Sequence, residues 1–162
     1  MNQYYDYDDH LLNLDSSKPL VHIYSIPQTI IVLGRNSKIE QELNLKYGLT
    51  NNIPIKKRYG GGCSVLIDSN NIIVSIVMKI PGLKFKSYFN QISYKIIDAF
   101  KYLGFDGLYL AGISDLAYKD KKIAGSCVYR KKDLLYYSCS VLFNADINLI
   151  QNALLYPPIE PE

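Results

Sequence analysis

A glycine triplet interrupts the chain one residue after three cations and directly before a run of β-forming residues. The stretch reads KKRYGGGCSVLID and begins at Lys56. Its glycines are Gly60, Gly61 and Gly62. Glycine lets a ligand lie against the backbone, and converging amides form a concavity that binds anions. Because Arg58 adds a planar fork of donors beside the triplet, the pattern favours an anion-binding loop. A tight turn between strands also explains a triplet taken alone.

An acid and a lysine occur together in a second segment, GISDLAYKDKKIAGSCVYR (112–130). Asp115 and Lys122 fall on what we expect to be adjacent strands of one hairpin. Such a pair is usually a surface ion pair worth under about 1 kcal/mol. It also suits a site in which Asp115 holds Mg²⁺ and Lys122 meets an α-phosphate or a substrate carboxylate. Gly125 lies inside strand-like sequence, where a ligand or a second backbone can approach closely.

The composition of the whole chain narrows the class of protein. Its 162 residues are 48% hydrophobic and 20% charged, which is typical of one globular domain. No apolar stretch approaches the ~20 residues of a membrane span, and the N-terminus carries acids where a signal peptide carries cations. Three cysteines without paired spacing fit a reducing cytoplasm. A net charge of +3, with no cations interleaved with aromatics, gives no support for nucleic acid as a partner.

Hydrophobic periodicity predicts an α+β fold with mixed, largely antiparallel sheets and flanking helices. Helices are predicted over residues 4–14 and 87–103, and a capping box predicts another that opens at Ser37. Strands are predicted at 21–26, 29–34, 115–118, 122–130 and 134–143. The runs at 63–68 and 71–80 are predicted to pair with each other as a hairpin.

Taken together, these segments resemble the lipoate–protein ligase branch of the biotin/lipoate ligase and octanoyltransferase superfamily. RYGGGCSVLID resembles the family's R-R-x-x-G-G-G motif, which wraps the acyl chain. SDLAYKDKKIAG resembles its asparagine/serine–aspartate motif followed by lysine–small–glycine. YSIPQTIIVLGRN is similar to the Pro–x–x–hydrophobic–Gly–Arg segment, and PPIEPE to the start of a proline–x–x–glutamate–proline segment. The resemblance covers nearly the whole chain, with the motifs in the family's order.

The resemblance implies a single biotin/lipoate ligase-like catalytic domain over residues 1–162, without the family's usual C-terminal extension or accessory domain. The implied reaction is ATP-dependent activation of lipoate to lipoyl-AMP with Mg²⁺, followed by transfer to a lysine of a lipoyl carrier domain. That carrier would belong to a 2-oxoacid dehydrogenase or a glycine-cleavage-type protein, and a separate accessory subunit could supply the missing part. No membrane partner is implied.

The resemblance also assigns roles to residues. Lys122 takes the position of the catalytic lysine, and Asp115 that of the motif aspartate, which would bind Mg²⁺. The implied substrate-binding residues are Arg35, Arg58, Tyr59, Gly60, Gly61, Gly62, Asn71, Asp115, Gly125 and Tyr137.

Departures from the family pattern leave alternatives open. Tyr136 and Tyr137 replace the usual histidines, and Ile73 stands where a second asparagine usually follows Asn71. A cysteine-dependent octanoyl- or lipoyltransferase would need a thiolate, for which Cys139 is the candidate near the late strand. A non-catalytic lipoate- or biotin-binding subunit that works with a partner is the second alternative. The sequence leaves lipoate, octanoate and biotin open as the acid.

Overall fold

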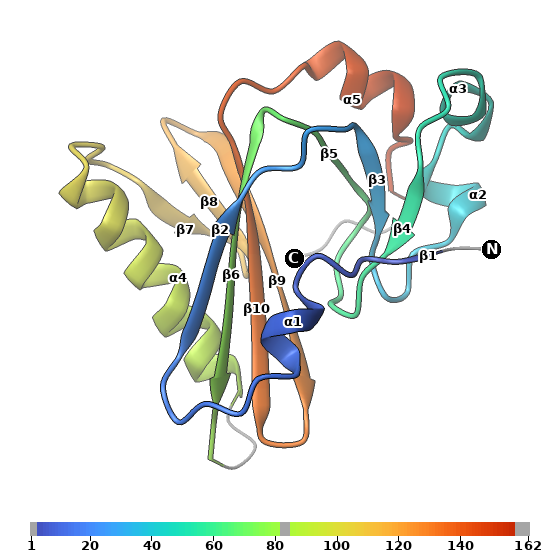
Figure 1. Ribbon diagram of the computed structural model, residues 1–162. Helices are drawn as coiled ribbons and strands as arrows, with labels where there is room; N and C mark the ends of the chain where they lie inside the picture. Colours follow the sequence, from blue (N-terminus) through green and yellow to red (C-terminus); the bar gives the residue numbers. More distant parts are fainter. Residues whose placement is uncertain (1–2, 82–84, 158–162) are drawn as a thin grey trace.

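Two β-sheets pack against each other in the computed structural model of the chain, which describes residues 3–81 and 85–157 (Figure 1). In this part of the chain the larger sheet has six strands: β2 Leu20–Tyr24, β6 Asn71–Lys79, β7 Tyr109–Ala111, β8 Asp115–Tyr118, β9 Lys121–Lys131 and β10 Leu134–Leu142. They lie in the order β2-β6-β10-β9-β8-β7, and every neighbouring pair is antiparallel.

The smaller sheet, within the same described ranges, has four strands: β1 Gln3–Tyr4, β3 Ile30–Leu33, β4 Ile55–Lys57 and β5 Val65–Ile67. Their order is β1-β4-β3-β5. The β1–β4 and β3–β4 pairs are parallel, and the β3–β5 pair is antiparallel. The predicted α+β class with mixed, largely antiparallel sheets is therefore confirmed.

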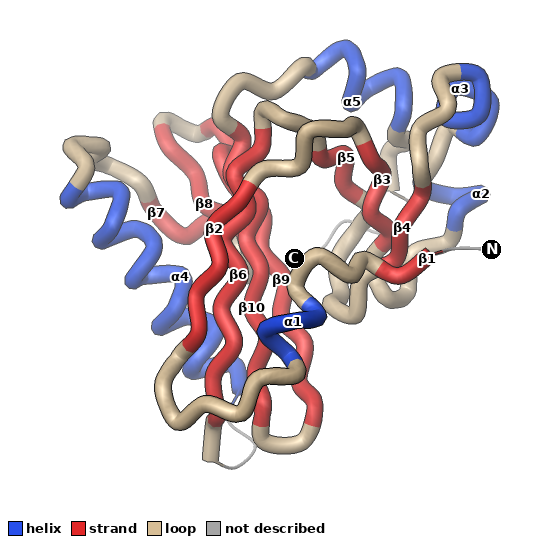
Figure 2. Tube along the Cα trace, in the orientation of Figure 1, coloured by secondary structure: helices blue, strands red, loops and turns tan. Residues whose placement is uncertain are grey.

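The helices of the described residues are α1 Asp9–Leu12, α2 Ile39–Glu42, α3 Leu45–Thr50, α4 Phe85–Tyr102 and α5 Ile147–Ala153. Helix α4 covers the outer face of the larger sheet, α2, α3 and α5 lie on the outer side of the smaller sheet, and α1 packs on the inner face of the larger sheet (Figure 2). The predicted helix over 87–103 corresponds to α4, whose Phe89, Ile92 and Ile96 pack on the larger sheet as their spacing predicts. Among the described residues, no helix combines the length and the apolar character that crossing a membrane requires.

Strand β3 lies between two apolar layers. Ile30 and Val32 belong to the cluster between the sheets, whereas Ile31 and Leu33 pack on the opposite side with Ala153 of α5. A strand that is buried on both faces has a continuous rather than an alternating apolar run, and TIIVLG is such a run. The smaller sheet therefore forms an apolar wall that faces the larger one.

The predicted helix over residues 4–14 is wrong for most of its length. Gln3–Tyr4 instead pairs in parallel with β4, the amide of Tyr5 donates to the carbonyl of Lys57 at 2.9 Å, and only Asp9–Leu12 is helical. The extended path buries the side chains of Tyr5 and Asp8 between the sheets. Tertiary pairing outweighs the helical spacing here.

The predicted hairpin between 63–68 and 71–80 is also wrong. Strand β5 pairs with β3 in the smaller sheet, whereas β6 pairs with β2 and β10 in the larger one. Side chains close the connection between them: the amide of Asn70 donates to Asp68 Oδ1 at 2.8 Å, and the amide of Asp68 donates to Asn71 Oδ1 at 3.0 Å. This turn carries the chain from one sheet to the other.

Candidate functional site

A cavity of about 140 Å³ lies between the two sheets. On the inner face of the larger sheet, small residues line it: Gly125 and Cys127 of β9 stand opposite Ser140 and Ser138 of β10. The glycine loop and the smaller sheet form the facing wall. The predicted site residues that line this cavity are Arg58, Gly62, Asp115, Lys122 and Gly125.

Asp115 and Lys122 lie on adjacent strands of one hairpin, as predicted. Lys122 Nζ is 2.8 Å from Asp115 Oδ2, with both side chains partly exposed. Pairing between β8 and β9 runs Leu116↔Ala124 and then Ala117↔Lys122, so a β-bulge occurs at Ile123. The bulge turns Ile123 toward the core beneath α4 and turns Lys122 toward the cavity.

Gly125 lies beneath this ion pair and leaves room for it. A Cβ atom at this position would lie 3.3 Å from Lys122 Cε and 3.6 Å from Asp115 Oδ1. The lysine can therefore lie flat across the sheet with its ammonium over the glycine. This places one positive charge at the mouth of the cavity, where an anionic group can meet it.

The glycine loop is held by Arg58. Its guanidinium donates to the carbonyls of Val32 at 3.1 Å, Gly61 at 2.7 Å and Cys63 at 2.8 Å. The Arg58 side chain thus holds the loop through hydrogen bonds to backbone carbonyls, and it also lines the cavity. Gly62 has a φ of +87°, a backbone conformation that glycine adopts without strain.

On the other side, the loop contacts the larger sheet. A Cβ atom on Gly60 would lie 2.6 Å from Cys127 Sγ, so no side chain fits there. The Tyr59 ring stacks between the rings of Tyr4 and Tyr129, with centroid distances of 5.0 and 5.1 Å. Tyr59, Gly60 and Gly61 therefore anchor or continue the loop but do not line the cavity.

Arg35, Asn71 and Tyr137 also lie outside the cavity lining. Arg35 is exposed, and its amide donates to the carbonyl of Gly60 at 2.9 Å. Asn71 Nδ2 donates to the hydroxyl of Ser140, a lining residue, at 3.1 Å, so it stands one step behind the cavity. Tyr137 is fully buried on the α4 side, where its hydroxyl is 3.2 Å from Ser93 Oγ. Strand alternation places its neighbour Tyr136 in the cavity instead.

The three thiols are not poised as nucleophiles. Cys139 is fully buried in the core beneath α4, and burial raises the pKa of its thiol to about 12. Cys63 and Cys127 line the cavity, and burial raises the pKa of each thiol above its ordinary value. A neutral thiol is a poor nucleophile, so this arrangement does not favour the transferase alternative.

Glu42 holds the far end of the glycine loop, which the sequence did not indicate. Its Oε2 accepts from the amide and the hydroxyl of Ser64 at 2.6 and 2.7 Å, and from Ser37 Oγ at 2.9 Å. Burial raises the pKa of the Glu42 carboxyl, but these hydrogen bonds and the charge of Arg58 lower it by more. Ser37 therefore binds this carboxylate; the cap of α2 is Lys38, contrary to the predicted capping box.

Tyr5, Asp8 and Tyr136 are further residues that the sequence did not indicate. Tyr5 and Tyr136 line the cavity, and Asp8, only 2% exposed, accepts a hydrogen bond from Tyr136. An acid in an acidic N-terminal stretch gives no signal of burial. The repeated tyrosines at positions 4, 5 and 7 were the available hint of an interior contact.

The fit of Mg²⁺ rests on Asp115 alone. The described residues contain no group of three or more His, Cys, Asp or Glu side chains that could hold a metal ion together. Magnesium often takes one carboxylate from the protein and its other ligands from substrate phosphates and water. Asp115 suits that mode, with Oδ2 shared with the Lys122 ammonium.

Comparisons of the sequence and of the structure with known proteins point to the same family. The family model of the lipoyl protein ligase A/B catalytic domain matches residues 3–160. Lipoate–protein ligase 1 of Staphylococcus aureus is 27% identical over 136 residues, which are 84% of this chain and 41% of that protein. The chain thus spans about two fifths of the length of this curated relative.

Two solved structures share the fold. The bipartite lipoate protein ligase of Thermoplasma acidophilum, described with its E2 lipoyl domain, superposes with a TM-score of 0.83 at 22% identity, over 94% of this chain and 60% of that one. Lipoate-protein ligase A bound with ATP superposes with a TM-score of 0.77 at 23% identity, over 86% of this chain and 60% of that one. Together with the family match over nearly all residues, these likenesses lead to one conclusion: the chain belongs to the lipoyl protein ligase A/B catalytic-domain family.

Proposed function

We propose that this chain is the catalytic domain of a lipoate–protein ligase, which activates lipoate with ATP and transfers the lipoyl group to a lysine of a carrier domain. The observation that carries the proposal is that the Lys122 ammonium and the backbone of Gly62 meet in one cavity. A ligase must hold a carboxylate against an α-phosphate, and both groups are anionic. A cation beside bare backbone suits that task.

The proposed reaction has two steps. A carboxylate oxygen of lipoate attacks the α-phosphorus of ATP, and the bond to pyrophosphate breaks, which leaves lipoyl-AMP. The neutral amine of the carrier lysine then attacks the acyl carbonyl carbon, the bond to AMP breaks, and the amine gives up a proton. The protein forms no covalent bond in either step, so positioning and charge stabilisation are its main contributions.

Lys122 is proposed to donate hydrogen bonds to the α-phosphate and to the attacking carboxylate. Its side chain is 54% exposed, so it can leave Asp115 for an incoming anion without opening the core. Asp115 would hold the ammonium in place before substrate arrives. It would also be the protein's ligand to Mg²⁺, which would neutralise charge on the phosphate oxygens when bound.

The slot for the acyl chain is proposed to run along β9 and β10. It begins at Gly125 and Ser140 and passes over Cys127 and Ser138. Val65, Ile67 and Ile73 supply apolar wall. An aliphatic acid would therefore lie between the sheets with its carboxylate at Lys122.

The partner is proposed to be a lipoyl carrier domain of a 2-oxoacid dehydrogenase or a glycine-cleavage-type protein, in the cytoplasm. The bipartite relative of Thermoplasma acidophilum supports a second proposal, that an accessory subunit completes the site. We propose that residues 1–162 form a single domain. We propose neither nucleic acid nor a membrane as a partner.

The experiment that tests the proposed function is ATP–pyrophosphate exchange with lipoate, octanoate and biotin, run with and without fractions that supply an accessory subunit. We expect exchange with lipoate. Binding of lipoate by calorimetry without exchange under any of these conditions would instead favour the non-catalytic binding subunit. A thioester trapped on Cys139 would favour the transferase.

A further inference from the structure

The inner end of the slot is closed by two tyrosines. Tyr136 lies four residues from Ser140 on the same face of β10, which corresponds to about 13 Å at 3.3 Å per residue. Since Ser140 pairs with Gly125, the Lys122 end and the Tyr136 end are opposite ends of the cavity. Tyr5, from the N-terminal segment, lines the cavity together with Tyr136. The tail of a bound acid would therefore end against these two rings.

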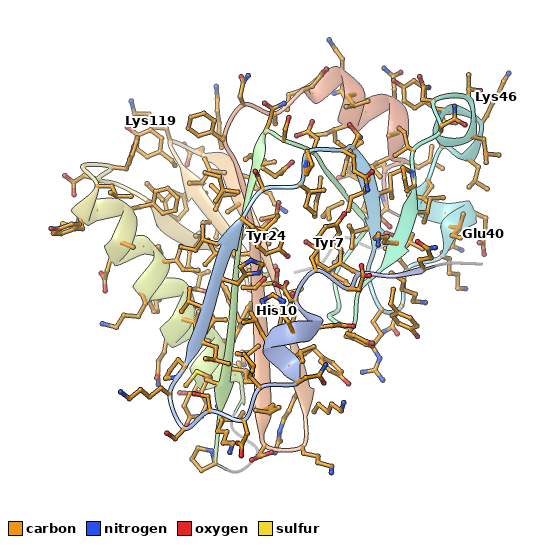
Figure 3. All side chains as sticks on the ribbon, viewed as in Figure 1. Tyr7, His10, Tyr24, Glu40, Lys46 and Lys119 are labelled. Atoms are coloured by element: carbon orange, nitrogen blue, oxygen red, sulfur yellow. The ribbon has the colours of Figure 1, made fainter. Side chains whose placement is uncertain are left out.

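Behind the tyrosines lies a buried carboxylate that the proposed reaction does not use. Asp8 Oδ2 accepts from the hydroxyls of Ser75 at 2.6 Å, Tyr136 at 2.7 Å and Tyr24 at 2.8 Å. Asp8 Oδ1 is 3.0 Å from His22 Nδ1, which carries the proton because a carboxylate only accepts. Figure 3 shows Tyr24 beside Tyr7 between β2 and the N-terminal segment.

The carboxylate fixes the direction of the hydroxyl protons around it. Each hydroxyl has one proton, and those of Ser75, Tyr24 and Tyr136 point at Asp8. Tyr5 Oη is 2.8 Å from Tyr24 Oη. Because the Tyr24 proton is already donated to Asp8, the proton between the two tyrosines belongs to Tyr5.

The same reasoning extends to Ser138 in the middle of the slot. Its Oγ is 3.3 Å from Ser75 Oγ. The proton of Ser75 goes to Asp8, which is the shorter contact and the charged acceptor. Ser138 is therefore left as the donor toward Ser75 or toward the Tyr136 hydroxyl, its other side-chain partner. The inner part of the slot therefore presents tyrosine side chains and oxygen lone pairs, and its hydroxyl protons are directed away from the ligand.

We propose that Asp8 is a specificity-determining residue, which acts by drawing these protons out of the slot. A slot end without a donor rejects any acid whose tail carries a hydrogen-bond acceptor, because that acceptor loses water and gains no partner. Acids that end in an apolar group meet no such penalty. This inference rests on the proposed function in one respect: the ligand is a carboxylic acid long enough to reach from Lys122 to Tyr136.

A matched pair of acids tests the inference directly. Octanoate ends in a methyl group, whereas 7-oxooctanoate carries one carbonyl acceptor near the same end. With the full chain, we expect calorimetry to give a dissociation constant about tenfold or more weaker for 7-oxooctanoate, from the cost of an unpaired acceptor. Equal affinities would overturn the proposal.

Two variants separate Asp8's effect from simple packing. Tyr24→Phe removes the acceptor of the Tyr5 proton, which is then free to turn into the slot, so the ratio of the two dissociation constants should fall toward one. Asp8→Asn should lower it as well, since an amide donates to the surrounding oxygens and redirects their protons. Tyr136→Phe is the matched control, because it deletes a hydroxyl whose own proton goes to Asp8 and leaves Ser138 with Ser75 as its acceptor, and it should keep the wild-type ratio.

The outcomes are distinguishable. Thermal melts identify any variant that fails to fold, and Tyr24→Phe, which keeps the ring, carries the test if Asp8→Asn does not fold. An unchanged ratio in folded Tyr24→Phe contradicts the proposal, as does an equal loss of discrimination in Tyr136→Phe. Pyrophosphate exchange is not needed for this readout, so failure of the proposed function and failure of this inference would be seen separately.

Discussion

Lys122 Nζ lies 2.8 Å from Asp115 Oδ2 because a β-bulge at Ile123 reverses the alternation of β9. In a regular strand, Ile123 would share the cavity face with Gly125, and Lys122 would point toward α4. The bulge exchanges the two side chains. It therefore turns Lys122, the only lysine among the described residues that lines the cavity, toward the cavity.

Asp115→Asn should weaken acid activation without unfolding the chain. The substitution removes the carboxylate that holds Lys122 and that is proposed to bind Mg²⁺, so we expect kcat/KM for exchange to fall about 10- to 100-fold, the usual effect of losing a residue that orients a functional group. The matched control is Asp98→Asn on the exposed side of α4, for which we expect a change of less than about twofold. If Asp115→Asn exchanges as fast as wild type, the ion pair has no part in catalysis.

Gly60→Ala should destabilise the protein, whereas Gly61→Ala should not. A Cβ on Gly60 would meet Cys127 Sγ at 2.6 Å, whereas nothing lies within 4 Å of a Cβ on Gly61. We expect urea denaturation to show a loss of about 1–3 kcal/mol for Gly60→Ala and less than about 0.5 kcal/mol for Gly61→Ala. Equal losses would mean that the loop does not contact the larger sheet as described.

Glu42 should contribute to stability in a pH-dependent way. Because the pKa of its carboxyl is lowered in the folded state from 4.5, its contribution is present above that unfolded value and is lost as the pH falls through the lower folded value. Glu42→Gln should therefore flatten the loss of stability below about pH 4.5 in acid titrations followed by circular dichroism. Glu40→Gln, an exposed residue on the same helix (Figure 3), is the control and should leave the profile as in wild type.

Cys139→Ala should leave exchange activity intact. The thiol is fully buried, its pKa is raised to about 12, and it faces α4 rather than the cavity. We expect lipoate-dependent exchange within about twofold of wild type, with a stability loss on the order of 1 kcal/mol from the small space left behind. Iodoacetamide should not alkylate Cys139 in the native protein at pH 8. Loss of activity in a folded variant would reopen the thiol mechanism.

Local sequence predicted the elements that depend on local patterns. The stripe of Phe89, Ile92 and Ile96 predicted the helix α4, and the two short strand patterns predicted the β8–β9 hairpin with Asp115 and Lys122 on adjacent strands. Periodicity and turn chemistry decide such elements within a few residues of chain.

Long-range contacts explain what the sequence did not predict. Strands β5 and β6 follow each other closely, yet each finds its partners in a different sheet, and no local signal encodes that choice. Asp8 is an acid among acids in sequence, and only the fold brings Ser75, Tyr24 and Tyr136 around it. Tyr136, rather than the predicted Tyr137, lines the cavity because a shift of one residue along a strand changes the face.

The most direct test of the proposed role of Lys122 compares the rate of ATP–pyrophosphate exchange by Lys122→Ala with that by Lys121→Ala. The two lysines are neighbours on β9, but Lys121 does not line the cavity. With lipoate, and with accessory subunit where exchange requires it, we expect Lys122→Ala to lose about 10²- to 10³-fold in rate, the usual effect of removing one charge-stabilising donor. Lys121→Ala should stay near wild type. Undiminished exchange in a folded Lys122→Ala protein would contradict the account.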